Sequence, residues 1–428
     1  MCENKLQSII GEHKRSGKGG VVSVCSAHPM VLRAAAASAK AYDALLLIES
    51  TSNQVDQFGG YTGLTPSEFI TQTRDAMLNE GVSEERLVFG GDHLGPNAWQ
   101  DKPADEAMDL AEELIRQYAQ AGFAKIHLDC SMSCADDPVP LDDVTVAKRA
   151  ARLCVAAEEA SKDSPYAGKI VYIIGTEVPV PGGAQEDLDI LTPSSADDAR
   201  QTYRVHQDIF AEHGLEAVWS RVVGLVVQPG VEFDHHQVIA YQPEAAQELV
   251  ALADEFDHAL FEAHSTDYQT PSAFKALVRD HFAILKVGPA LTFAYREAVF
   301  ALSRALREFR PEARVDVEAV LEAVMCAEPS RWQKYYHGNK HELALLRRYS
   351  LSDRARYYWP NDAIQAELAR LVEAFNEQPL PYGVLHQYLG QALEACHEQG
   401  LNPNAEQLII QHIRLALNPY YQAITEAL

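Results

Sequence analysis

Eight short apolar runs recur along the first two thirds of the chain, separated by helical or loop stretches. They cover residues 21–25, 45–48, 87–89, 125–129, 169–174, 222–227, 259–263 and 282–287. Continuous apolar strands that alternate with helices are typical of a parallel sheet covered on both faces. Eight such units over roughly 290 residues suit a closed barrel, with catalytic groups at the carboxyl ends of the strands. The pattern predicts an α/β fold, a TIM (β/α)8 barrel, over residues 1–295.

A doubly wound open sheet is the alternative fold. No Gly-x-Gly-x-x-Gly motif follows the first strand, so a dinucleotide site lacks support. Beyond residue 295 the apolar positions fall three and four apart, as in amphipathic helices, within 294–309, 315–326, 362–376, 384–399 and 405–417. We therefore expect residues 296–428 to form a helical C-terminal extension that packs on the barrel.

Polar residues follow several of the apolar runs. The third run leads into Gly90-Gly91-Asp92-His93-Leu94-Gly95-Pro96, in which a carboxylate and an imidazole sit between glycines. If all eight strand ends converge, one pocket receives Glu49, Ser52, Asn53, Asp92, His93, Asp129, Glu177, Gln228, His264 and Lys286. Two imidazoles with several carboxylates suit a divalent metal, and nitrogen ligands favour zinc over manganese, nickel or cobalt.

We expect His93 and His264 to be metal ligands, with His235 as the third and Glu177 or Asp129 as its replacement. His28 and His127 are left out, because His127 lies within a strand and is expected to face away from the pocket. Asp92 is the expected proton acceptor beside the metal, and Glu177 and Asp129 are further catalytic candidates.

Substrate oxygens have several candidate partners near the last strands. Ser265, Asp267 and the turn at Lys286 and Gly288 offer donors for hydroxyls or a phosphate. Residues 347–360 are dense in arginine and aromatic residues, and such a segment is often a solvated basic face. The alternative is an arginine, for which we choose Arg348, that reaches over the barrel mouth to a phosphate.

The composition of the chain argues against some classes of binding partner and indicates a compartment. The formal charge of −25 argues against nucleic acid or an anionic membrane as a partner. Seven cysteines without paired Cys-x-x-Cys spacing, and no secretory signal before them, indicate the cytoplasm. No apolar run approaches the length of about 20 residues that spans a bilayer. A homo-oligomer is compatible with these features.

Several strings resemble the GatZ/KbaZ family, named as the accessory subunit of class II D-tagatose-1,6-bisphosphate aldolase. They include Cys25-Ser26-Ala27-His28-Pro29, Phe58-Gly59-Gly60-Tyr61-Thr62-Gly63, the segment 90–96, Gly175-Thr176-Glu177-Val178-Pro179-Val180-Pro181, Glu262-Ala263-His264-Ser265-Thr266-Asp267 and Leu285-Lys286-Val287-Gly288-Pro289-Ala290. The resemblance implies a relative of the zinc-dependent class II aldolases. It places Asp92-His93 and His264 where those enzymes carry their acid/base residue and metal ligands.

The resemblance implies two functions of different classes. Relatives described as epimerases suggest a metal-dependent C4 epimerase that interconverts fructose 6-phosphate and tagatose 6-phosphate by retro-aldol cleavage and aldol re-formation. The older description suggests a non-catalytic subunit that stabilises a class II tagatose-bisphosphate aldolase. A kinase finds little support, because no Gly-x-x-x-x-Gly-Lys-Ser/Thr loop is present.

Overall fold

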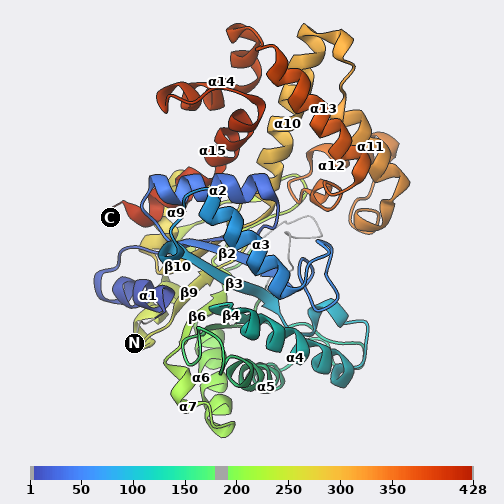
Figure 1. Cartoon of the computed structure of the whole chain (residues 1–428). Helices are drawn as coiled ribbons and strands as arrows, with labels where there is room; N and C mark the ends of the chain where they lie inside the picture. The colour runs from blue at the N-terminus through green and yellow to red at the C-terminus, as the bar shows by residue number, and fades with distance from the viewer. Residues whose placement is uncertain (1–3, 179–190, 427–428) are drawn as a thin grey trace.

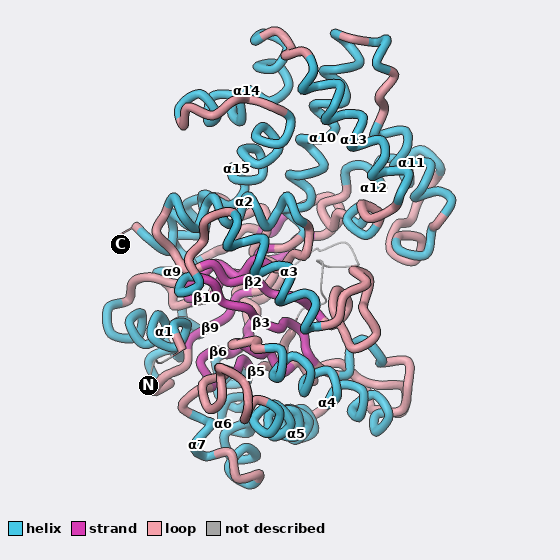
Figure 2. Tube along the Cα trace, in the orientation of Figure 1, coloured by secondary structure: helices cyan, strands magenta, loops and turns pink. Residues whose placement is uncertain are grey.

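The computed structural model describes residues 4–178 and 191–426. Its centre is a closed barrel of parallel strands in the order β1-β10-β9-β6-β5-β4-β3-β2 (Figures 1 and 2). The barrel strands are β1 (Val21–Val24), β2 (Leu46–Thr51), β3 (Leu87–Leu94), β4 (Lys125–Leu128), β5 (Val171–Ile174), β6 (Val222–Val227), β9 (Leu260–Ala263) and β10 (Phe282–Val287). Each predicted run forms one of these strands, so the TIM barrel is confirmed.

Helices surround the barrel, as the alternating pattern predicted (Figure 2). They are α1 (Lys5–Ser16), α2 (Pro29–Ala41), α3 (Pro66–Asn79), α4 (Ala104–Ala121), α5 (Asp143–Ala160), α6 (Ala196–Glu212), α7 (Glu216–Trp219), α8 (Gln247–Leu252) and α9 (Pro271–Arg279). Local sequence sets their starts: Thr65 and Glu68 form a capping box on α3, with Pro66 in its first turn. A separate two-stranded ribbon pairs β7 (Glu232–Phe233) with β8 (Val238–Ile239).

The C-terminal helices form a lobe on one side of the barrel (Figure 1). They are α10 (Pro289–Phe309), α11 (Val317–Ala327), α12 (Lys340–Tyr349), α13 (Asp362–Glu377), α14 (Tyr382–Glu398) and α15 (Ala405–Thr425). The expected boundary at residue 295 falls inside α10, which begins directly after β10 and continues into the lobe. Helix α15 returns to the barrel and packs against α2, α9 and α10.

Long apolar side chains fasten this lobe to the barrel. Tyr420 of α15 packs against Phe274 of α9 with 3.8 Å between ring centroids and a tilt of 36° between the rings, and its hydroxyl donates to the Thr266 carbonyl. The segment between α12 and α13 also reaches the barrel mouth, where the buried Trp359 meets Tyr295 of α10. None of the described helices is long and apolar enough to cross a membrane.

Candidate active site

A cavity of about 1,100 Å³ opens at the carboxyl ends of the barrel strands. Its inner part is lined by strand-end residues, among them Asp92, His93, His264 and Lys286. Its outer part is lined by the C-terminal lobe, including Arg354 and other residues between α11 and α13. The mouth of a TIM barrel is where this fold carries its active sites.

Glycines allow the third strand to bring two adjacent polar residues into this cavity. A side chain at position 90 would come within 2.7 Å of Glu49 Oε1, and one at 95 within 1.7 Å of the Asp129 carbonyl. The pairing of β3 with β4 shifts between Gly91 and Leu94, and His93 adopts a left-handed φ of 48°. This irregularity suspends the usual alternation of side chains, so Asp92 and His93 both line the cavity.

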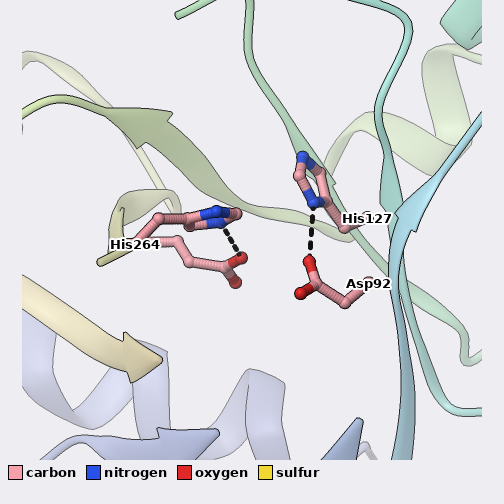
Figure 3. Close-up of side chains that lie close together, drawn as sticks. Asp92, His127 and His264 are labelled. Atoms are coloured by element: carbon pink, nitrogen blue, oxygen red, sulfur yellow. Dashed lines mark hydrogen bonds and ion pairs between the residues drawn. The ribbon is translucent and has the colours of Figure 1, made fainter. Parts of the chain in front are cut away.

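Three histidines meet at the bottom of the cavity, each bonded to its own carboxylate; His93 and His264 line the cavity, whereas His127 is fully buried beside them. His93 Nδ1 lies 2.8 Å from Asp129 Oδ2, and His127 Nδ1 lies 3.0 Å from Asp92 Oδ1. His264 Nε2 lies 2.9 Å from Glu262 Oε1 (Figure 3). The ring centroids are 5.0 Å apart for His93 and His264, 5.3 Å for His93 and His127, and 5.2 Å for His127 and His264.

A ring of four buried charges lies beneath these imidazoles; we call Glu49, Lys125, Glu262 and Lys286 the charge ring. Lys125 Nζ is 2.5 Å from Glu49 and 2.8 Å from Glu262. Lys286 Nζ is 2.8 Å from Glu49 and 3.3 Å from Glu262, and it also pairs with Asp92. Each carboxylate of the ring therefore contacts both ammonium groups, the arrangement that buried charges need.

These contacts decide the protonation states. Burial acts to raise the pKa of Asp92, but His93 and Lys286 outweigh it and hold that pKa well below the usual carboxyl value. Burial and the nearby Lys286 lower the pKa of His264 to about 3, so its ring is neutral at physiological pH. Burial would lower the pKa of Lys286, yet Asp92, Glu262 and Glu49 raise it well above normal. The cavity thus presents an ionised carboxylate beside a neutral imidazole.

This donor set fits a divalent metal. Potential ligand atoms of Asp92, His127, Glu262 and His264 all lie within 4.8 Å of one another. His127 Nε2 is buried and has no hydrogen-bond partner among the described residues. A metal-binding histidine characteristically bonds a carboxylate through its other ring nitrogen, and all three rings here have such a carboxylate.

Comparison with known proteins places the chain in a family. A family model described as D-tagatose-1,6-bisphosphate aldolase subunit GatZ/KbaZ-like matches residues 6–425. The chain belongs to this family. A crystal structure of a probable tagatose 6 phosphate kinase from Sinorhizobium meliloti 1021 is 44% identical, with a TM-score of 0.86. The match covers 94% of this chain and 100% of that one.

Two solved structures are more distant. A glycerol complex of fructuronate-tagaturonate epimerase UxaE from Cohnella laeviribosi is 15% identical, covers 98% of this chain and 85% of that one, and has a TM-score of 0.49. A fructose-bisphosphate aldolase from Campylobacter jejuni is 14% identical, covers 87% and 93%, and has a TM-score of 0.46. At these values neither similarity bears on the activity of this member of the GatZ/KbaZ-like family.

Most residues that the sequence suggested lie at or behind the cavity of this GatZ/KbaZ-like chain. Those that line it are Asn53, Asp92, His93, His264, Ser265, Asp267, Lys286 and Gly288. Three others lie behind its wall: Glu49 in the charge ring, Ser52 with its hydroxyl on the His93 carbonyl, and Asp129 beneath His93. Asp129 therefore supports a histidine rather than facing the cavity.

Four of the suggested residues lie elsewhere. His235 has both ring nitrogens engaged, with Ser352 Oγ at 3.1 Å and the Tyr335 carbonyl at 3.0 Å, so it does not join the other histidines. Gln228 uses its side-chain oxygen to hold the turn at residues 230–231. Glu177 accepts from Ser194 in a separate small pocket. Arg348 donates to the Ala344 carbonyl of its own helix and is not among the cavity residues.

The sequence interpretation missed three residues inside the barrel. His127 was expected to face away, but it shares its parity with Lys125 and Asp129, and side chains two apart lie on one face of a strand. All three point to the barrel interior. Glu262 was overlooked although it stands in an apolar strand, where an isolated charge is costly unless it is paired. A charged residue inside an apolar run was the signal that could have found Lys125 and Glu262.

Proposed function

We propose that this chain is a divalent-metal-dependent C4 epimerase of a ketohexose 6-phosphate, which interconverts fructose and tagatose forms. The observation that carries the proposal is the cluster of three carboxylate-bonded imidazoles beside the ionised Asp92. A subunit with a purely structural role needs no such set at the bottom of a cavity. The family description, which names tagatose bisphosphate, supports the sugar class.

Asp92 is the group that we assign to proton transfer. Its carboxylate lines the cavity, and its lowered pKa keeps it ionised, and so able to accept a proton, before the reaction begins. It takes the proton of the C4 hydroxyl, and the electron pair of that O–H bond forms the C4 carbonyl as the C3–C4 bond breaks. The products are the enediolate of C1–C3 and the aldehyde of C4–C6.

Rotation of the aldehyde before the bond re-forms inverts C4. The C3 carbon attacks the opposite face of the aldehyde, and the resulting C4 alkoxide takes the proton back from Asp92. Direct removal of the C4 hydrogen is much harder, because that carbon is not adjacent to the C2 carbonyl. Lys286 and His93 flank Asp92 and stabilise its charged form during the cycle.

We propose that His127 and His264 are the ligands of the metal ion. His93 lies beside these two ligands. When bound, a divalent ion would polarise the C2 carbonyl and offset the negative charge of the enediolate. Asp129, Asp92 and Glu262 hold the three rings in place through the other ring nitrogens. Zinc suits these nitrogen donors best.

One experiment tests the proposal directly. Purified protein with bound metal, incubated with fructose 6-phosphate in D₂O, should form tagatose 6-phosphate without deuterium at C4, because the C4 hydrogen stays on the aldehyde. Chelation should stop the reaction and added metal restore it. Absence of tagatose 6-phosphate from protein with confirmed metal would contradict the proposal, and deuterium at C4 would contradict the mechanism.

A second candidate follows from the word "subunit" in the family description. In that role the chain stabilises a class II tagatose-bisphosphate aldolase without catalysing a step. Co-expression with such an aldolase separates the two functions: an accessory role survives Asp92→Asn, whereas the epimerase does not. Full stabilisation by Asp92→Asn protein, together with no epimerase activity in the wild type, would favour the subunit.

A further inference from the structure

The outer wall of the cavity carries positive charge from the C-terminal lobe. We call Arg331, Lys334, Arg354 and Arg356 the lobe cations, and all of them line the cavity. They gather around two tyrosines: the Arg354 guanidinium lies 3.5 Å from the ring centre of Tyr335, and that of Arg356 lies 4.5 Å from Tyr357. Arg331 and Lys334 extend the same group outwards.

None of the lobe cations forms an ion pair with a carboxylate within the described part of the chain. Other arginines of the lobe do, namely Arg296, Arg304, Arg307, Arg347 and Arg370. The chain has 61 acidic against 36 basic residues, so acidic partners are abundant. Unpaired cations at one wall of a cavity leave that wall ready for an anion from outside.

The two inner arginines are held in place by backbone carbonyls and aromatic rings. Arg354 is 8% exposed, and its Nε donates to the Arg331 carbonyl. Both terminal nitrogens of Arg354 are without a hydrogen bond to the described residues. Arg356 donates to the Asp353 carbonyl at 3.1 Å and to the Tyr357 hydroxyl at 2.9 Å. A guanidinium fixed in this way can donate hydrogen bonds to phosphate oxygens with little loss of side-chain entropy.

The same positive charges act on the pKa of Tyr357. Burial acts to raise the pKa of this phenol, yet Arg356 and Arg354 outweigh burial, so that the pKa lies below its ordinary value. An anion placed among these groups would meet an attractive field.

In this chain a carboxylate side chain occupies the position at which TIM barrels usually bind phosphate. Phosphates bind there at the loops after the last two strands and at the start of the following helix. In this chain Asp267 fills that position: its Oδ1 accepts from Gly288 N at 3.0 Å and from Ala290 N at 2.8 Å. Asp267 and Gly288 were expected to hold hydroxyls or a phosphate, and the hydrogen bonds between them leave these backbone donors engaged with a carboxylate of the chain itself.

We infer that the terminal phosphate of the sugar phosphate binds to the lobe cations, with Arg354 and Arg356 as its principal contacts. The inference rests on the proposed function and adds the part of the chain that selects a phosphorylated substrate. Carbons C1–C4 then lie towards the histidines, and the phosphate lies at the outer wall of the same cavity. The C-terminal lobe thereby acts as the specificity element of the site.

Calorimetric titration of the full-length, metal-loaded protein tests this placement. The probes are fructose 6-phosphate, inorganic phosphate and free fructose. Arg354→Gln and Arg356→Gln should each weaken binding of the two phosphates at least tenfold and leave binding of fructose unchanged. Arg348→Gln is the matched control, because Arg348 lies on the same lobe outside the cavity, and it should bind like the wild type.

Variants at the outer edge keep the test valid if an inner variant fails to fold. Arg331 and Lys334 are exposed, so the double variant Arg331→Gln/Lys334→Gln should fold normally and weaken fructose 6-phosphate several-fold. Unchanged phosphate binding in the folded variants, or equal wild-type affinity for fructose and its 6-phosphate, would overturn the inference. Phosphate binding that depends on the lobe cations without any epimerisation would refute the proposed function and leave this site standing.

Discussion

The floor of the cavity and its outer wall both gather charged side chains, but only the floor neutralises them internally. In the charge ring every ammonium faces two carboxylates, and all four groups are buried. At the outer wall the lobe cations stack on aromatic rings and meet no carboxylate of the described chain. Floor charges therefore hold the strands and histidines in place, and wall charges are available to a ligand.

We expect the largest effect from a substitution of Asp92, whose carboxylate contacts both the charge ring and the imidazoles. Asp92→Asn removes the proton acceptor, and we expect kcat for the conversion of fructose 6-phosphate to fall about 1,000-fold, or about 4 kcal/mol of barrier. Chromatographic separation of the two sugar phosphates measures it. Asp109→Asn, on the exposed face of α4, is the control; a variant at 92 with a tenth of wild-type activity would contradict the assignment.

Removing one member of the charge ring should cost stability. Lys125→Met leaves Glu49 and Glu262 short of a buried partner, and breaking such a pair costs about 3–5 kcal/mol. Urea denaturation followed by circular dichroism gives the free energy of unfolding. Lys102→Met, which disrupts an exposed pair with Glu106 on α4, should change it little. Equal effects of the two substitutions would show that the ring does not stabilise the barrel.

Asp267 lies between the floor and the outer wall of the cavity. Its contribution to the free energy of unfolding depends on pH. Burial raises its pKa from the usual 3.8 to about 6. Because the folded state holds the proton more tightly than the unfolded state, this carboxyl costs stability as pH rises through that range, by roughly 3 kcal/mol. Asp267→Asn keeps the Oδ1 acceptor for Gly288 and Ala290 but has no proton to lose.

The gain in unfolding free energy from Asp267→Asn should therefore be larger near neutral pH than below the usual carboxyl pKa of 3.8. Urea titrations at both ends of that range measure the gain against wild type. A gain that does not change with pH would mean that this carboxyl ionises as easily in the folded protein as in the unfolded one.

The smallest effect on stability should come from the outer wall. Removing Arg331 and Lys334 together should change the free energy of unfolding by no more than about 0.5 kcal/mol, because both side chains are exposed. The same double variant should raise KM for fructose 6-phosphate several-fold with kcat nearly unchanged. A large loss of stability with an unchanged KM would contradict the assignment of the wall charges to ligand binding and of the floor charges to stability.

Much of the site was predictable from the sequence, and the errors have local causes. Asp92, His93 and His264 were expected at strand ends, and all of them line the cavity. His127 was expected to face away from the cavity because the alternation of side chains along its strand was assigned to the wrong face. Glu262 and Lys125 were overlooked because they stand in otherwise apolar runs. Among the arginines, Arg348 was chosen, whereas the cavity receives Arg354 and Arg356 from a few residues further on. Those two arginines lie six and eight residues after Arg348, beyond the end of α12 at Tyr349, and the apolar periodicity does not say which arginine faces the barrel.

The sequence by itself determined the eight strands, because buried parallel strands read as continuous apolar runs wherever they occur. Their number favoured a closed barrel over an open sheet, and the strand pairing in the structure showed the closure. It also determined that polar groups stand at the strand ends. Only the tertiary structure decided how those groups pair. The bulge at Asp92-His93, the four-membered charge ring and the approach of the C-terminal lobe all depend on residues far apart in the chain that fit within a few ångströms of one another.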